Sequence, residues 1–228
     1  MVDNNFIRSI LEEYNHLGMI VFEQGFELAH QLFPDGGTCL EFGVGSGHSF
    51  SRMAQRLCDK YKKTKIIGFD SWQGLPSETK DVWCPERHTK GMFKFNKVDV
   101  LRRLSPMLNL DTEKRIRLVD GFFEESLTES LRKEITNLIF VNIDVDIHKS
   151  THQALDFIAP LLQENTLLYF DDWKDPDDVI LLGTNVKWGE HLAWEQWCEK
   201  HPGVESEVVT TSYANQPLIR IKATGGIY

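Results

Sequence analysis

Residues 38–47 read TCLEFGVGSG, and this short stretch decides the fold. A run with strand character, Thr38 to Phe42, leads directly into a glycine-rich turn, and helical spacing follows over about residues 48–62. Glycine lets the backbone approach a ligand closely, and the N-terminus of the following helix favours anionic groups. A plain tight turn has similar residues, but the strand before it and the helix after it favour a nucleotide-binding turn.

Short apolar runs alternate with helical stretches over the rest of the chain. We expect further buried strands at residues 65–70, 116–119, 138–143 and 166–170 and a helix at 149–161. Strands that are apolar on both faces and separated by helices predict a parallel sheet with right-handed crossovers. A helix at about 188–200 and strand-like runs at 205–211 and 217–222 predict a closing antiparallel hairpin. The expected fold is therefore α/β, Rossmann-like, with helices on both faces of the sheet.

Two segments fall outside this alternation. Residues 4–33 have helical spacing, so we expect an N-terminal helical lid or cap over residues 1–34, and a main domain over residues 35–228. The apolar helices of the first segment are also suited to a homodimer interface. Residues 72–100 have no clear period, and their aromatic side chains predict an ordered, irregular lid.

Composition excludes several classes of protein. The formal net charge of −9 argues against a nucleic-acid partner, and four scattered cysteines without a CxxC pair suit a reducing compartment. The sequence contains no apolar run of about 18 residues and no signal-peptide pattern, so we expect neither a membrane span nor secretion. A cytoplasmic enzyme or binding protein is the expectation.

Acidic residues stand at the ends of the predicted strands. Glu41 precedes the glycine turn and suits a ligand ammonium, held directly or through water, and Asp70 suits a pair of ribose hydroxyls. Asp120, followed by Phe122, suits an adenine amino group and its ring face. Each aspartate is also a possible helix cap.

Asp144 and Asp171 end two further strands and are separated by 27 residues (171 − 144), which one strand–helix–strand unit fills. Ligands bind at the carboxyl ends of parallel strands, so these carboxylates and Asp172 should converge there. Three carboxylates close together repel unless a cation lies between them, and oxygen ligands favour Mg²⁺. The alternative is that the Asp171–Asp172 pair diverges and one member caps a helix.

Several motifs in order resemble the class I S-adenosylmethionine-dependent methyltransferases. They are LEFGVGSG, IIGFDSWQGLP, KGMF, RLVDGFFEESL, IDVDIHKST and LLYFDDW, over about residues 38–173. The string is most similar to the macrocin O-methyltransferase (TylF/MycF) family of metal-dependent sugar O-methyltransferases, whose acceptors are vicinal diols. The resemblance implies that Asp144, Asp171 and Asp172 hold Mg²⁺. The cofactor residues that it implies are Glu41, Gly43, Gly45, Ser49, Asp70, Ser71, Asp120, Gly121, Phe122 and Asp144.

Methyl transfer to oxygen needs a base, and we expect Asp144 in this role as well as in metal binding, with His148 as the alternative. A catechol-type acceptor is less favoured, because the position of the usual lysine is Ile147 and Lys149 lies two residues further on. An NAD-dependent dehydrogenase would need GxGxxG, whereas Gly47 follows Gly45-Ser46 directly. A non-catalytic nucleotide-binding protein is the third alternative.

Overall fold

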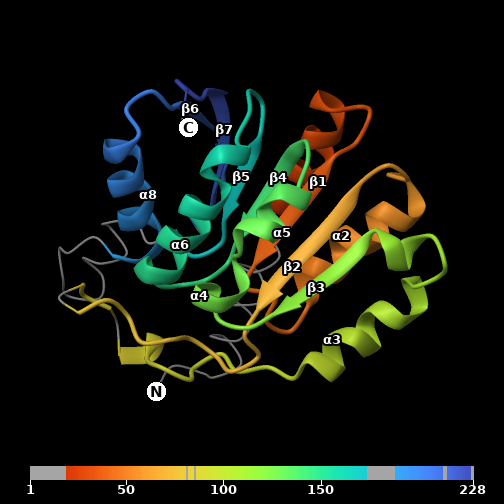
Figure 1. The fold of residues 1–228 in the computed structure, drawn as a ribbon, viewed down its shortest axis with the longest axis horizontal. Coiled ribbons are helices and arrows are strands. Elements are labelled where there is room, and N and C mark those ends of the chain that lie inside the picture. Colours follow the sequence, from red (N-terminus) through yellow and green to blue (C-terminus); the bar gives the residue numbers. More distant parts are fainter. Residues whose placement is uncertain (1–18, 81, 85, 174–187, 213–214, 227–228) are drawn as a thin grey trace, which may run out of the picture.

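The computed structural model describes residues 19–80, 82–84, 86–173, 188–212 and 215–226. One seven-stranded sheet runs through this part of the chain, in the order β3-β2-β1-β4-β5-β7-β6 (Figure 1). Its strands are β1 Thr38–Phe42, β2 Lys65–Asp70, β3 Ile116–Asp120, β4 Leu138–Ile143, β5 Leu167–Phe170, β6 Glu205–Thr211 and β7 Pro217–Ala223. Neighbours among β1 to β5 pair in parallel, whereas β7 is antiparallel to both β5 and β6. The predicted fold, a Rossmann-like sheet closed by an antiparallel hairpin, is confirmed.

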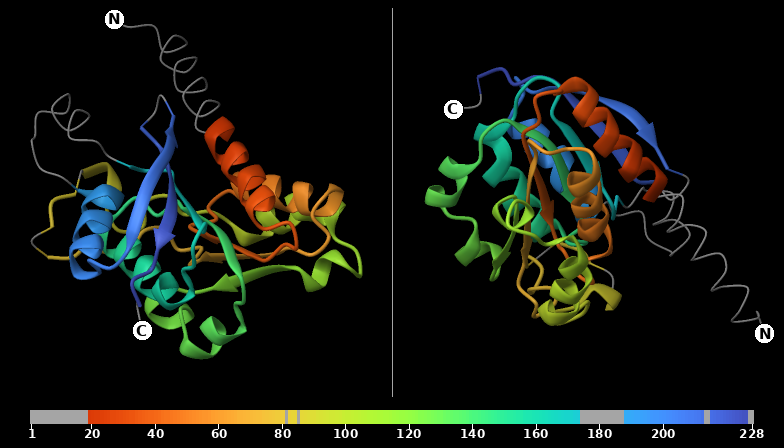
Figure 2. Two further views of the ribbon diagram at one scale, coloured as in Figure 1. Left: turned by 90° about the horizontal axis from the view of Figure 1, so that it is seen from above. Right: turned by 90° about the vertical axis from the view of Figure 1, so that its right-hand side faces the viewer.

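Helices cover both faces of the sheet, which is why the central strands are apolar on both sides. Every residue of β1, β4 and β5 is buried. The helix over residues 19–32 lies with α2 and α3 on one face, and α4, α5, α6 and α8 lie on the other (Figure 2). The bounds are α2 His48–Asp59, α3 Lys97–Leu104, α4 Phe123–Ser126, α5 Glu129–Glu134, α6 His148–Ile158 and α8 Gly189–Lys200.

The segment that we predict as a lid, residues 72–100, is partly helical, and its irregular part (residues 72–96) is called the lid segment, or lid, below. Residues 72–96 are mostly irregular, apart from one 3-10 turn at Glu86–His88, and they cross below the carboxyl ends of the strands (Figure 1). Lys97 begins α3, within the stretch that we expected to be irregular throughout. Asn96 caps this helix by accepting the Val98 amide at 2.9 Å. With only Val100 and Leu104 buried, its apolar stripe is too short for a clear helical period.

At the N-terminal end, residues 19–32 are helical as predicted, while residues 1–18 of the expected lid or cap lie outside the described part of the chain. The division at residue 34 therefore stays a prediction. Among the described residues, no helix has the length and apolar character that crossing a membrane requires.

Sheet register places the strand ends side by side. Phe42 of β1 pairs with Phe69 of β2 and with Ile143 of β4, and Ile143 pairs in turn with Phe170 of β5. The residues that follow these positions therefore emerge at one level of the same edge. Strand order reverses between β1 and β4, and ligands of open α/β sheets bind at such a switch point.

Candidate active site

A cavity of about 690 Å³ lies at this edge, between the strand ends and the lid. This volume falls in the usual range for small-molecule sites. The cavity brings together most of the predicted site residues: Gly43, Gly45, Ser49, Asp70, Ser71, Gly121, Phe122, Asp144, Asp171 and Asp172. Three further predicted site residues do not line the cavity among the described residues: Glu41, Asp120 and His148.

The glycine turn is packed against the β4 loop. Gly43 has a positive φ of 82°, and a Cβ built on it would lie 1.7 Å from the carbonyl oxygen of Asp144. Its own amide donates to the carbonyl oxygen of Phe69 at 2.9 Å. Only glycine combines this backbone conformation with so close an approach, so the turn and the loop of Asp144 are held in direct contact.

Glu41 is buried behind the turn. The hydroxyl of Ser49, which does line the cavity, donates to Glu41 Oε1 at 2.7 Å. Burial raises the pKa of Glu41 to about 8, although the hydrogen bond from Ser49 opposes this rise. A positive group close to Glu41, such as the predicted ligand ammonium, would lower this pKa and favour the charged carboxylate.

Asp70 fixes the far side of the same turn. Its Oδ2 accepts the Gly45 amide at 2.8 Å, and its Oδ1 accepts the Trp72 amide at 2.7 Å. Burial raises the pKa of Asp70, and these backbone amides oppose the rise. The carboxylate lines the cavity at the predicted ribose position while it orders the loops on both sides.

The carboxylate of Asp120 does not line the cavity and binds Lys97 and Trp72 instead. Lys97 donates to both of its carboxylate oxygens at 2.6 Å, and the Trp72 indole N–H donates to Oδ1 at 2.9 Å. Burial opposes the shift, but these hydrogen bonds lower the pKa of Asp120. The next two residues, Gly121 and Phe122, do line the cavity. In this structure they, and not Asp120, face the part of the cavity where we predict the adenine.

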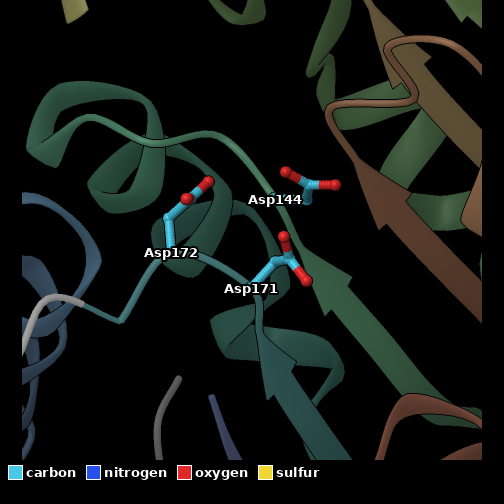
Figure 3. A group of neighbouring side chains, drawn as sticks. All are labelled: Asp144, Asp171 and Asp172. Atoms are coloured by element: carbon cyan, nitrogen blue, oxygen red, sulfur yellow. The ribbon is translucent and has the colours of Figure 1, made fainter. Parts of the chain in front are cut away.

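Three carboxylates meet at the ends of β4 and β5. Asp144, Asp171 and Asp172 each offer an oxygen within 4.8 Å of the others, and Figure 3 shows them gathered around one space. Burial and the charges of Asp171 and Asp172 raise the pKa of Asp144 well above its usual range. An all-oxygen set at this spacing fits a hard divalent cation such as Mg²⁺, which removes the repulsion. The residues present therefore fit the predicted metal.

Two neutral side chains orient Asp171. The Tyr169 hydroxyl donates to its Oδ1 at 3.2 Å, and the Gln216 amide donates to the same oxygen at 3.0 Å. Gln216 precedes β7, 45 residues further along the chain, and it lines the cavity. The sequence contains no local signal for this contact, which depends on the antiparallel pairing of β5 with β7.

The β4 loop presents a fourth carboxylate that the prediction left out. Asp146 lines the cavity with a positive φ of 59°, a strained conformation for a residue other than glycine. Its Oδ1 lies 2.9 Å from Nε2 of the buried His88 of the lid. Glu78, also of the lid, accepts the Lys149 amide at the start of α6 at 3.0 Å. The Asp-x-Asp spacing was the available signal for Asp146, whereas nothing in the sequence indicated His88.

His148, the first residue of α6, contacts α8. The residue is 7% exposed, and its Nε2 lies 2.8 Å from the Gln196 amide oxygen. Ile147, at the position of the catechol-type lysine, is fully buried, and Lys149 pairs with Glu124 at 2.6 Å. The structure therefore keeps His148 apart from the carboxylate cluster and offers no lysine in the catechol-type position.

Comparison with known proteins agrees with this geometry. Residues 40–173 match the methyltransferase domain family. CalS11, a calicheamicin methyltransferase, has a TM-score of 0.69 at 20% identity, and the O-methyltransferase NovP has 0.68 at 18%. Both matches cover 89% of this chain and 79% of the other. An O-methyltransferase from Bacillus cereus in complex with SAH has a TM-score of 0.53 at 16% identity, covering 93% of this chain and 89% of that one.

No curated protein matches the chain in sequence. The family match alone spans more than half of the 228 residues and includes the glycine turn and the carboxylate cluster. The solved structures, all under 25% identical, add the shape of the fold. The chain therefore belongs to the methyltransferase domain family and has the class I S-adenosylmethionine-dependent methyltransferase fold.

Proposed function

We propose that the protein is a metal-dependent O-methyltransferase of the macrocin (TylF/MycF) type, which moves a methyl group from S-adenosylmethionine to a hydroxyl of a vicinal diol on a sugar or glycoside. The observation that carries this proposal is the carboxylate cluster of Asp144, Asp171 and Asp172, which opens into the same cavity as the glycine turn and Asp70. Solved relatives support the acceptor class, because CalS11 is described as a TDP-rhamnose 3′-O-methyltransferase.

On the side that would bind the methyl donor, the protein has to align the cofactor. Methyl transfer is an in-line displacement on a sulfonium, so the rate depends on how well donor and acceptor are oriented. We assign Asp70 to the ribose hydroxyls and Glu41, through Ser49, to the methionine end. The close approach of Gly43 to the Asp144 carbonyl holds the glycine turn against the β4 loop, which carries the proposed metal ligand Asp144.

On the acceptor side, Asp144, Asp171 and Asp172 would hold Mg²⁺. When bound, the ion would supply the Lewis acidity that lowers the pKa of an acceptor hydroxyl. Asp144 lies in the cluster, and a carboxylate that shares its lone pairs with a cation is a weaker base. Asp146 lines the same cavity outside the cluster, and His88 orients it, so we propose Asp146 beside Asp144 as a candidate base.

Ligand-dependent thermal stability tests the cofactor and the metal together. We expect S-adenosylmethionine at about 100 times its Kd to raise Tm by roughly 5–10 °C, and NAD to leave Tm unchanged. Mg²⁺ should add a further increase that EDTA removes. Stabilisation by NAD alone would contradict the proposal and favour the NAD-dependent dehydrogenase alternative.

A methyl-transfer screen over nucleotide sugars, glycosides and catechols, with Mg²⁺ present, identifies the acceptor. We expect turnover of a sugar or glycoside. Turnover of catechols only would contradict the sugar proposal and favour a catechol-type acceptor.

Replacing Asp70 should weaken cofactor binding specifically. Asp70→Ala removes a carboxylate that accepts two backbone amides and, in the proposed complex, the ribose hydroxyls. Charged hydrogen bonds of this kind contribute about 1.5–3 kcal/mol, so we expect the Kd for S-adenosylmethionine to rise about 10- to 100-fold by calorimetry. The exposed Asp59, at the end of α2, supplies the control Asp59→Ala. An unchanged Kd in Asp70→Ala would remove Asp70 from the ribose site.

A further inference from the structure

A buried glutamate stands directly behind the carboxylate cluster. Glu190 is the second residue of α8 and is 0% exposed. It lies outside the family match, which ends at residue 173, and it does not line the cavity in the described part of the chain. A buried carboxylate next to three others is costly, so its position needs a reason beyond packing.

The contacts of Glu190 give that reason. Its Oε1 accepts the backbone amide of Val145 at 3.1 Å, and its Oε2 accepts the backbone amide of Asp172 at 3.0 Å. Val145 follows Asp144 in the β4 loop, and Asp172 follows Asp171 after β5. One side chain therefore joins the two loops that carry all three residues of the cluster, across 45 and 18 residues of sequence.

These two contacts require two accepting oxygens, which a carboxyl group supplies. Both partners are N–H donors, so the side chain must offer an accepting oxygen to each loop at once. The amide of glutamine has one oxygen and one NH₂ group, and the NH₂ group would face a second donor.

We propose that Glu190 is a positioning residue that sets the spacing of Asp144, Asp171 and Asp172 for a divalent cation. This inference rests on the proposed function, because it concerns the affinity of the metal site. It predicts that Glu190 acts on metal binding and leaves the cofactor side of the cavity unaffected. A residue that only stabilised the fold would affect both sides alike.

The test compares Glu190→Gln with the wild type and with Glu199→Gln, which removes an exposed carboxylate from the same helix. Mn²⁺ titration followed by electron paramagnetic resonance measures metal binding, and calorimetry measures S-adenosylmethionine binding. Outer hydrogen-bond partners of metal ligands change affinity by about 10- to 100-fold. We expect the Mn²⁺ Kd of Glu190→Gln to rise by that factor, with the cofactor Kd within twofold and Glu199→Gln unchanged. Turnover of Glu190→Gln should recover at high Mg²⁺, because the metal is bound weakly rather than lost.

The outcomes separate the two proposals. If the wild type itself fails to bind Mn²⁺, the proposed metal-dependent function fails. If the wild type binds Mn²⁺ and Glu190→Gln binds it within twofold, only the role of Glu190 is overturned. If Glu190→Gln also loses the cofactor, Glu190→Asp decides, since it keeps the carboxyl group and shortens the reach to the two amides. A weakened Mn²⁺ Kd with intact cofactor binding in Glu190→Asp then supports the proposal, and equal weakening of both ligands overturns it.

Discussion

Asp144→Asn should reduce methyl transfer by about 1,000-fold or more while S-adenosylmethionine still binds. The substitution keeps the size of the side chain but replaces one carboxylate of the proposed three-residue metal site with a neutral amide, which is a weaker ligand. Lewis-acid stabilisation contributes several kcal/mol, and each 1.36 kcal/mol corresponds to a factor of ten in rate. The rate is measured as S-adenosylhomocysteine formed with the acceptor that the screen identifies, and the cofactor Kd is measured by calorimetry.

Two further substitutions complete this experiment. Asp146→Asn should lower the rate at saturating Mg²⁺ with a much smaller effect on the metal Kd than Asp144→Asn, since Asp146 lies outside the cluster. Asp156→Asn, on the exposed face of α6, is the control and should resemble the wild type. Full activity of Asp144→Asn in the presence of EDTA would refute the metal role. A normal rate in Asp146→Asn would leave Asp144 as the candidate base.

Gly43→Ala should destabilise the protein by roughly 3 kcal/mol or more. The new methyl group would lie 1.7 Å from the Asp144 carbonyl oxygen, and the residue would also have to keep a φ of 82°. Overpacking and left-handed backbone strain each cost about 1–3 kcal/mol. For a chain of this size, Tm should fall by roughly 6–12 °C, which differential scanning calorimetry measures.

Gly91→Ala is the matched control. Gly91 has nearly the same conformation, with a φ of 85°, but a Cβ there would meet nothing within 4 Å. The backbone strain remains and the collision is absent, so we expect a loss of only about 1 kcal/mol. Equal losses in the two variants would mean that the turn and the β4 loop move apart to accommodate the methyl group at no measurable cost.

The sequence was sufficient for the part of the site that depends on strand ends. Asp144 and Asp171 each follow a short apolar run, and parallel strands in register bring their ends together without any detail of side-chain packing. The same reasoning located Gly43 and Asp70. These predictions required only the direction of each strand and the single helix that connects one strand to the next.

Contacts between distant segments could not be predicted in this way. His88 meets Asp146 because an irregular lid folds back across the sheet edge, and no local period reports where such a segment lies. His148 was placed near the cluster by its position in the motif, but the first turn of α6 directs it toward Gln196. Asp120 was predicted from its strand end, whereas Lys97 of α3, a helix missing from the prediction, engages its carboxylate.

The order of the segments along the chain also bears on when the carboxylate cluster can form during synthesis. Asp171 and Asp172 are held by Gln216 and Glu190, which come later in the chain. Ribosomes add roughly 5–20 residues per second, and a domain generally folds as a unit. The loops after β4 and β5 are therefore held in place only after Glu190 and Gln216 have been synthesised.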